Sequence, residues 1–455
     1  MATRVEIAEA IRLYMAEPKR RFRWMPVSCS VEAVELGSEF EGADLTEVIA
    51  PCRIVTSCGC FKAVFAISAK VGSQLTLDEV FEVTSAPKLD QMLRGLNFIG
   101  PEAKVVREGL GSGGDDFFMK PAQLDQTNSA FFVGKAGFGK FYRACSSNSR
   151  EARMYRMLEG STAVSHYWGS FSDETGSVSA VVVDRIEDAS SAFDVALQML
   201  SGQDLEAEAA VTELIHETGA LLGRLHDDLE AAQNRDKATT PDDVAKWLAA
   251  RLELALLAPG VRPTRDASLL QDWATELSRL VDQLWGRWSS FEIHGDFHLG
   301  QVLKSGAGMV VIDFEGEPIS DAGAMDLPQR DLAGLLRSVG YVTALAAQQH
   351  TEVQSQSLVQ RLRAAALEGY ASSRVGERVL AEPASVALLG CFEVEKAIYE
   401  YVYEQRFRPQ MMFVPESFLF RVNDRIRELA ARCVLSADQS GDRSLRALIS
   451  AEYAL

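Results

Sequence analysis

The spacing of apolar residues divides the chain into three parts. Residues 1–95 begin with apolar positions at helical spacing, which predict a short helix. They continue with partly alternating segments at 31–36 and 61–67, which predict strands. Residues 96–190 are predicted to form strands joined by polar turns. From 191 to 455 apolar residues recur every three or four positions, a pattern typical of helices. The chain is therefore predicted to be an α+β protein with a helical second half.

The stretch from Phe291 to Pro318 interrupts the helical half with a polar loop, a short hairpin through Gly306 and Gly308, and a buried apolar strand. It reads FEIHGDFHLGQVLKSGAGMVVIDFEGEP and places Asp296 and Asp313 17 residues apart, with Gln301 between them. Phosphoryl transfer needs a carboxylate that accepts a hydroxyl proton and oxygen ligands that hold Mg²⁺ against the phosphates. This stretch therefore indicates a phosphotransfer site; the alternative is that the two aspartates only cap turns.

The same stretch resembles the aminoglycoside-phosphotransferase-like branch of the protein-kinase fold. Within that branch, HGDFHLGQVL and VVIDFEGEP resemble the maltokinases and the related bacterial glucosamine kinases, which carry Gln at the position of Gln301. The resemblance implies a protein-kinase-like bilobal fold. Its parts would be an N-terminal cap subdomain at 1–95, a β-rich nucleotide-side lobe at 96–190, and a large helical C-terminal lobe at 191–455 with the catalytic loop and the sugar site.

The resemblance also implies a role for each polar residue of this stretch. Asp296 would accept or orient the proton of the attacking sugar hydroxyl, while Gln301 and Asp313 would bind Mg²⁺ at the ATP phosphates. Glu315 would reach a second metal ion or the sugar. His298 would either contact the substrate or fix the loop, and the loop role is favoured.

The nucleotide-binding residues are predicted from their order along the chain. Kinases use a strand lysine that binds the phosphates and a helix glutamate that holds this lysine. Lys140 and Glu151 follow that order along the chain. The alternative is that they are an ordinary surface lysine and an ordinary helix acid. Residues 126–133 resemble the maltokinase segment in place of the phosphate-covering loop, and 178–186 occupies the place of the kinase hinge. The predicted nucleotide-binding residues are Lys140, Glu151, Asp184, Ile186, Gln126 and Ser129.

The helix predicted over 393–407 carries the candidate sugar-binding residues. At about 100° per residue its apolar positions share one side, and its charged residues fall away from them. Such a charged face usually faces solvent, but E-x-x-K-A-x-Y-E resembles the maltokinase helix that lines the sugar pocket. Carboxylates of this face would meet the ammonium of an amino sugar. The predicted substrate residues are Asp296, His298, Lys396, Tyr399, Glu400, Tyr403 and Glu404.

Two further features are expected to have supporting roles. Residues 329–338 resemble the family helix L-R-D-V-A-x-x-L-R-S, and Asp331 in this helix is expected to brace the catalytic loop. His216 and His226 lie ten residues apart in a predicted helix. We interpret them as helix-surface or packing residues and not as metal ligands.

Composition and charge narrow the partners and the compartment. The net charge of −18 argues against a nucleic-acid or anionic-membrane partner, but not against ATP, whose charge is met locally. Cys58 and Cys60 form the only close cysteine pair, so reduced thiols are favoured over a zinc site. No apolar run approaches about 18 residues and no signal core is present, which favours a cytoplasmic protein. The sequence does not indicate an oligomeric state.

These features predict an ATP- and Mg²⁺-dependent sugar kinase. The acidic helix and the altered segment after Trp24 favour glucosamine as the substrate, giving glucosamine 6-phosphate, over maltose, giving maltose 1-phosphate. An aminoglycoside-type phosphotransferase ranks third, because the N-terminal extension and Gln301 speak against it. An inactive kinase-like binding module would be expected to have lost Lys140, Asp296 or Asp313, and all three are present.

Overall fold

The computed structural model divides the chain into two compact units. The first, here called the β unit, comprises Met1–Gly160 and Ser165–Ile186, and the second, the helical unit, comprises Ser161–Val164 and Glu187–Leu455. The domain boundaries near 95 and 190 stay predictions. The structure describes residues 4–16, 30–36, 47–57, 59–68, 96–106, 119–122, 129–146, 149–174, 176–201, 205–233, 238–256, 272, 274–275, 277–278, 287–317, 325–349 and 356–420. Gln126, Trp24 and Cys58 lie outside these ranges.

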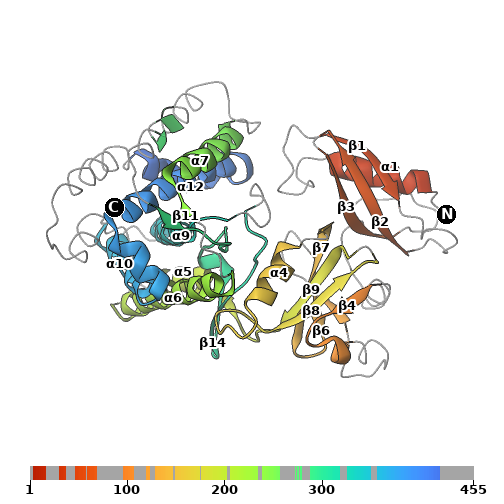
Figure 1. Ribbon diagram of the computed structural model, residues 1–455, viewed down its shortest axis with the longest axis horizontal. Coiled ribbons are helices and arrows are strands. Elements are labelled where there is room, and N and C mark those ends of the chain that lie inside the picture. Colours follow the sequence, from red (N-terminus) through yellow and green to blue (C-terminus); the bar gives the residue numbers. More distant parts are fainter. Residues whose placement is uncertain are drawn as a thin grey trace. The chain divides into compact units, whose positions relative to one another are not determined.

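The N-terminal part of the β unit is one helix beside three antiparallel strands (Figure 1). Its helix buries Ile7, Ile11 and Met15 on one side. The helix and the two strands predicted here are confirmed. The elements are α1 (Arg4–Ala16), β1 (Val31–Leu36), β2 (Glu47–Thr56) and β3 (Gly59–Ser68).

The rest of the β unit extends the same sheet. Its order is β1-β2-β3-β7-β9-β8-β4, with β5 and β6 continuing from β7, and every pairing is antiparallel. An aromatic core that includes Phe98, Phe131 and Phe171 covers it. The elements are β4 (Asn97–Ile99), β5 (Met119–Ala122), β6 (Ser129–Val133), β7 (Gly137–Ser146), α4 (Arg150–Met157), β8 (Tyr167–Ser172) and β9 (Val178–Asp184).

The helical unit is built around long helices, two of which approach very closely. A Cβ added at Gly219 would lie 2.1 Å from the carbonyl oxygen of Ala366, and one added at Gly369 would lie 2.0 Å from that of His216. Only glycine permits this backbone contact between α6 and α10, which lie side by side in Figure 1. The helices are α5 (Ala192–Ser201), α6 (Leu205–Gln233), α7 (Pro241–Leu256), α9 (Pro328–Gln349), α10 (Gln356–Ala371), α11 (Arg374–Ala381) and α12 (Pro383–Phe407).

Short strands and turns of the helical unit carry the stretch that is predicted to be catalytic. The predicted hairpin is confirmed: Val302 pairs with Val311, and the strands turn between Ser305 and Gly308. The elements are β10 (Ser190–Ser191), β11 (Ala238–Thr239), β12 (Trp288–Ser289), the 3₁₀ turns η4 (Leu299–Gln301) and η5 (Pro409–Met411), β13 (Val302–Ser305) and β14 (Gly308–Val311). Within the described ranges, no helix has the length and apolar character needed to cross a membrane.

Candidate active site

The β13–β14 hairpin places Gln301 beside Asp313. The backbone N–H of Ile312 donates to the carbonyl of Gln301 at 2.9 Å, so the ladder continues one step past β14. The Gln301 amide Nε2 then donates to Asp313 Oδ2 at 3.1 Å. Asp313 has φ 67°, a left-handed conformation that is uncommon for a residue with a side chain. The structure therefore brings two predicted metal ligands together in a strained turn.

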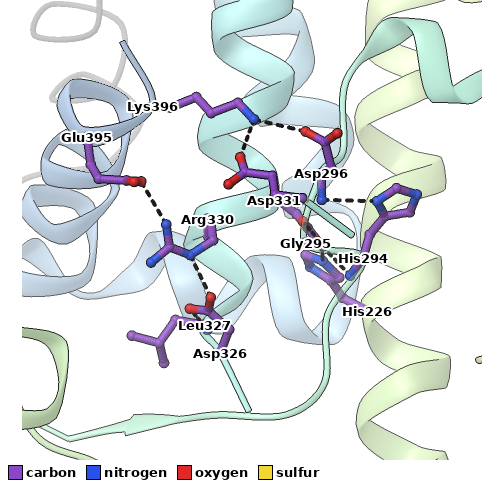
Figure 2. Close-up of polar contacts among 11 residues, drawn as sticks. His226, His294, Gly295, Asp296, Asp326, Leu327, Arg330, Asp331, Glu395 and Lys396 are labelled. Carbon is purple, nitrogen blue, oxygen red and sulfur yellow. Dashed lines mark hydrogen bonds and ion pairs between the residues drawn. The ribbon is translucent and has the colours of Figure 1, made fainter. Parts of the chain in front are cut away.

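The predicted catalytic loop is braced by Asp331 of α9, as expected from the sequence (Figure 2). Asp331 Oδ2 accepts a hydrogen bond from the backbone N–H of His294 at 2.8 Å, and Oδ1 accepts one from the N–H of Gly295 at 2.8 Å. Gly295 has φ 86°, which favours glycine here. One buried carboxylate therefore fixes the backbone immediately before Asp296.

Helix α9 also holds the loop through close packing. A Cβ added at Gly334 would lie 2.2 Å from the carbonyl oxygen of Phe297, so the helix backbone meets the loop directly. One turn later, Ser338 Oγ accepts a hydrogen bond from the N–H of Leu299 at 3.1 Å. Asp331, Gly334 and Ser338 thus position the loop from one helix face.

Two histidines connect this brace to the rest of the unit. His226 of α6 is fully buried; its Nε2 lies 3.0 Å from Asp331 Oδ2 and its Nδ1 lies 2.8 Å from the hydroxyl of Tyr370. Its packing role is confirmed and a surface position is wrong. His294 Nδ1 accepts from the N–H of Asp296 at 3.3 Å, so its Nε2 donates to the carbonyl of Ile312 at 2.9 Å. His294 therefore links the loop to the turn that presents Asp313.

We expect Asp331→Ala to lower the free energy of unfolding by about 3 kcal/mol or more, because the two backbone N–H groups and His226 lose a buried acceptor worth about 1–3 kcal/mol each. Burial alone would raise the pKa of Asp331, but hydrogen bonds from His226 and Gly295 hold it below its usual value. This stabilisation is present above the unfolded-state pKa of about 3.9 and is lost as the pH falls through the lower folded-state pKa.

Urea unfolding of Asp331→Ala and the parent at neutral and acidic pH measures this difference. The exposed Asp242→Asn is the matched control, because it changes a carboxylate at the start of α7. A variant as stable as the parent at neutral pH would show that Asp331 does not hold the loop.

Lys396 of α12 joins Asp296 to a second carboxylate. Its Nζ lies 2.9 Å from Asp296 Oδ1 and also forms an ion pair with Glu317. The Lys396 side chain is 14% exposed and that of Glu317 only 2%. Burial alone would lower the pKa of Lys396, but Asp296 and Glu317 raise it well above its usual value, so Lys396 is a cation.

Glu317 was not predicted from the sequence, and Glu315 was the only glutamate predicted to act at this end of the stretch. Glu315 is exposed, whereas Glu317 is buried beside Lys396. The available signal was a second glutamate after Asp313 in Asp-Phe-Glu-Gly-Glu. Spacing alone does not say which of the two turns inward.

His298 fixes the loop, the role favoured from the sequence. Its Nδ1 accepts a hydrogen bond from the N–H of Gly300 at 3.0 Å and caps η4. Burial lowers the pKa of His298, which agrees with an unprotonated acceptor nitrogen. Tyr399 and Tyr403 stack with ring centroids 6.1 Å apart, and Lys396 lies 5.2 Å from the Tyr399 ring centroid.

The glutamates of α12 are buried and paired with arginines, so the solvent-facing alternative for this face is wrong. Glu393, Glu400 and Glu404 are 3%, 9% and 1% exposed. Burial raises the pKa of Glu400 and of Glu404, and the nearby arginines oppose this effect. The pairs are Glu393 with Arg363 at 2.8 Å, Glu400 with Arg337 at 2.6 Å, and Glu404 with Arg408 at 2.5 Å.

In the β unit, the predicted pairing of Lys140 with Glu151 is confirmed. Lys140 lies on β7 between β6 and β9, and its Nζ is 3.2 Å from Glu151 Oε2 on α4. The hydroxyl of Tyr142 donates to the same oxygen at 2.6 Å. Glu151 is therefore oriented by two neighbours on one strand.

The other predicted nucleotide residues are spread over the β unit. Ser129 begins β6, and Asp184 ends β9, where its Oδ1 accepts from the indole N–H of Trp168 at 2.6 Å. Ile186 is half-buried and is the last residue of the unit. Their contacts with a nucleotide stay predictions.

The oxygen atoms at the hairpin suit a hard cation. Gln301, Asp313 and Glu315 offer amide and carboxylate oxygens, which Mg²⁺ prefers. Because the Gln301 amide nitrogen already donates to Asp313, its oxygen is the atom that would bind a cation. The donor set therefore fits the predicted metal.

Comparison with named proteins and solved structures agrees with the predicted resemblance. The chain is 27% identical to the glucosamine kinase of Mycolicibacterium smegmatis over 320 residues, covering 66% of this chain and 78% of that protein. It is 25% identical to the glucosamine kinase of Streptacidiphilus jiangxiensis over 339 residues, covering 70% and 76%.

The fold is also similar to solved glucosamine kinase structures. One crystal form superposes with a TM-score of 0.64 at 19% identity, covering 94% of this chain and 99% of that one. A complex with glucosamine, ADP and inorganic phosphate gives 0.58 at 18% identity, covering 91% and 98%. These likenesses confirm the kinase-like fold. The model of the phosphotransferase enzyme family matches residues 120–371, more than half of the sequence, and the chain belongs to this family.

Proposed function

We propose that this protein is an ATP- and Mg²⁺-dependent sugar kinase that phosphorylates glucosamine to glucosamine 6-phosphate. The observation that carries the proposal is the similarity, over about two thirds of the chain, to two proteins that are both named glucosamine kinases. The braced Asp296 and the Gln301–Asp313 pair supply the groups that phosphoryl transfer to an alcohol requires.

Asp296 is assigned as the base that orients the sugar hydroxyl and accepts its proton. Lys396 directs this carboxylate, while Asp331 fixes the loop backbone before it. Lys140, oriented by Glu151, would neutralise phosphate oxygens of ATP. Gln301, Asp313 and Glu315 would hold Mg²⁺, which supplies charge stabilisation to the transferring phosphoryl group.

We place the source of an amino-sugar preference away from the α12 glutamates, because their carboxylates are already paired. Glu393, Glu400 and Glu404 each accept from an arginine. Asp296 and Glu317, by contrast, are two carboxylates that share a single cation, Lys396. We therefore favour this carboxylate pair as the part of the acceptor site that meets the ammonium of glucosamine.

We expect glucosamine to be preferred over glucose and over N-acetylglucosamine by roughly 10- to 150-fold in kcat/KM. This is the range given by one charge-assisted hydrogen bond of about 1.5–3 kcal/mol. ADP release with saturating ATP and Mg²⁺ over a panel of these sugars and maltose measures it. Glu317→Gln is expected to narrow the preference for glucosamine more than Glu404→Gln does.

ADP release without sugar is the control for background hydrolysis. Equal use of glucose and glucosamine would remove the amino-sugar assignment. A clear preference for maltose would instead support the maltokinase alternative, to which the α12 motif is also similar.

A further inference from the structure

The helical unit contains a pocket that lies outside the residues assigned to phosphoryl transfer. It has a volume of about 550 Å³ and is lined by the end of α6, by β12, and by residues at the start of α9, α11 and α12. This volume is within the range of small-molecule sites, roughly 300–1,000 Å³. None of its lining residues belongs to the predicted nucleotide, metal or sugar set.

Two residues of this pocket carry buried polar atoms without a hydrogen-bond partner. Trp288 and Gln329 are 6% and 1% exposed, and the indole N–H of Trp288 and the amide oxygen of Gln329 have no partner. The Gln329 nitrogen donates to Ser385 Oγ at 2.8 Å. Across the described ranges only one other buried side-chain polar atom lacks a partner, and it belongs to the adjacent Arg330.

Such unpaired atoms are costly, about 1–3 kcal/mol each, so their presence on one pocket wall needs an explanation. One is a donor and the other an acceptor, a combination that a hydroxyl group of a ligand satisfies. Both atoms have almost no accessible surface, so contact with a ligand would require the indole or the amide to rotate toward the pocket.

The lining of the pocket is rich in arginine. Glu230 accepts from Arg374 and Arg378, at 2.6 Å in each case, and from Ser289 Oγ at 3.1 Å. Burial alone would raise the pKa of Glu230, but the bonds from Arg378 and Arg374 hold it below its usual value. With Arg287, the lining has three arginines and two glutamates, a positive balance in a chain of net charge −18.

We infer that this pocket binds a small anion that carries hydroxyl groups, of the phosphorylated-sugar class. The anionic group would lie against Arg287, and Arg374 and Arg378 of the lining would add positive charge. A sugar hydroxyl would accept from the Trp288 indole and donate to the Gln329 amide oxygen. The inference does not depend on which sugar the enzyme phosphorylates.

The pocket shares its walls with the support of the catalytic loop. Three residues after Trp288, Phe291 exchanges two backbone hydrogen bonds with Asp326, at 3.1 and 3.0 Å. Two residues after Gln329, Asp331 accepts from the loop. A ligand that orders β12 and the first turn of α9 therefore acts on the same segments that position Asp296.

The test reads the Trp288 indole directly by ¹H–¹⁵N correlation spectroscopy of the full-length labelled protein. Of the six tryptophans, the signal absent in Trp288→Phe is that of Trp288. Glucose 6-phosphate is expected to shift this signal strongly, inorganic phosphate to shift it weakly, and glucose to leave it near its starting position. The Trp247 signal, from outside the pocket, is the internal control.

Arg287→Ala tests binding of the anionic group separately from binding of the hydroxyl group. It is expected to raise the apparent Kd for glucose 6-phosphate, read at Trp288, by about tenfold, as expected for the loss of a charged hydrogen bond. A Trp288 signal that none of the three probes moves at millimolar concentration would overturn the site. A shift by glucose 6-phosphate with unchanged Kd in Arg287→Ala would overturn its anion specificity. Because the shift and its dependence on Arg287 are measured without ATP and without turnover, failure of the proposed kinase function would leave this result interpretable.

Discussion

Replacement of Asp296 by asparagine is expected to lower kcat for sugar phosphorylation by about 10²–10⁴-fold, the usual contribution of a positioned base. Asparagine keeps the shape of the side chain but cannot accept the hydroxyl proton. The backbone brace from Asp331 to Gly295 does not involve the Asp296 side chain, so the loop should keep its conformation. Lys396 also keeps one carboxylate partner in Glu317.

Steady-state kinetics, equilibrium binding of Mg²⁺-ATP and thermal unfolding together test this assignment. The expected result is a large loss of kcat with nucleotide affinity and melting temperature close to those of the parent. Asp242→Asn, an exposed change of the same type, controls for the loss of one negative charge. Activity within about tenfold of the parent would remove Asp296 from the role of base.

The parts of the site that the sequence predicted are those encoded by short, fixed spacings. The hairpin that joins Gln301 to Asp313 spans 12 residues, and its turn glycines and apolar strand are visible in the sequence. The pairing of Lys140 with Glu151 follows from the order of one strand and the next helix. The contact of Asp331 with the loop spans 36 residues and was expected only through the family resemblance.

The parts that the sequence did not predict depend on contacts between distant helices. Periodicity correctly placed Glu400 away from the apolar side of α12, but it could not show that Arg337 of α9, 63 residues earlier, lies opposite. A charged helix face that meets solvent and one that pairs with arginines of a neighbouring helix show the same spacing of charged residues in the sequence. For the same reason Lys396 was assigned to the sugar, while its contact with Asp296, 100 residues away, was not expected.

Lys396→Met is expected to lower both stability and activity. It removes the cation between Asp296 and Glu317 and leaves Glu317, whose side chain is 2% exposed, without this partner. Loss of one partner of a buried ion pair costs about 3–5 kcal/mol. The Asp296 carboxylate also loses the contact with Lys396 that orients it. Misplacement of a reacting group by about 1 Å can lower the rate about 10²-fold.

The double variant Lys396→Met/Glu317→Gln separates these two effects. In Lys396→Met, Glu317 keeps a buried negative charge without its lysine partner, and Glu317→Gln removes this charge. The double variant should therefore regain more than half of the lost free energy of unfolding. Its kcat should stay low, because no cation directs Asp296. Glu377→Gln, an exposed change on α11, is the control for the loss of one glutamate charge.

Urea unfolding gives the stabilities, and kcat is compared with the KM for ATP in all variants. A loss confined to kcat in the double variant would identify Lys396 as the residue that directs Asp296. If the double variant instead recovered kcat together with stability, Lys396 would serve only to neutralise Glu317. The orientation of Asp296 would then have to come from the loop backbone that Asp331 holds.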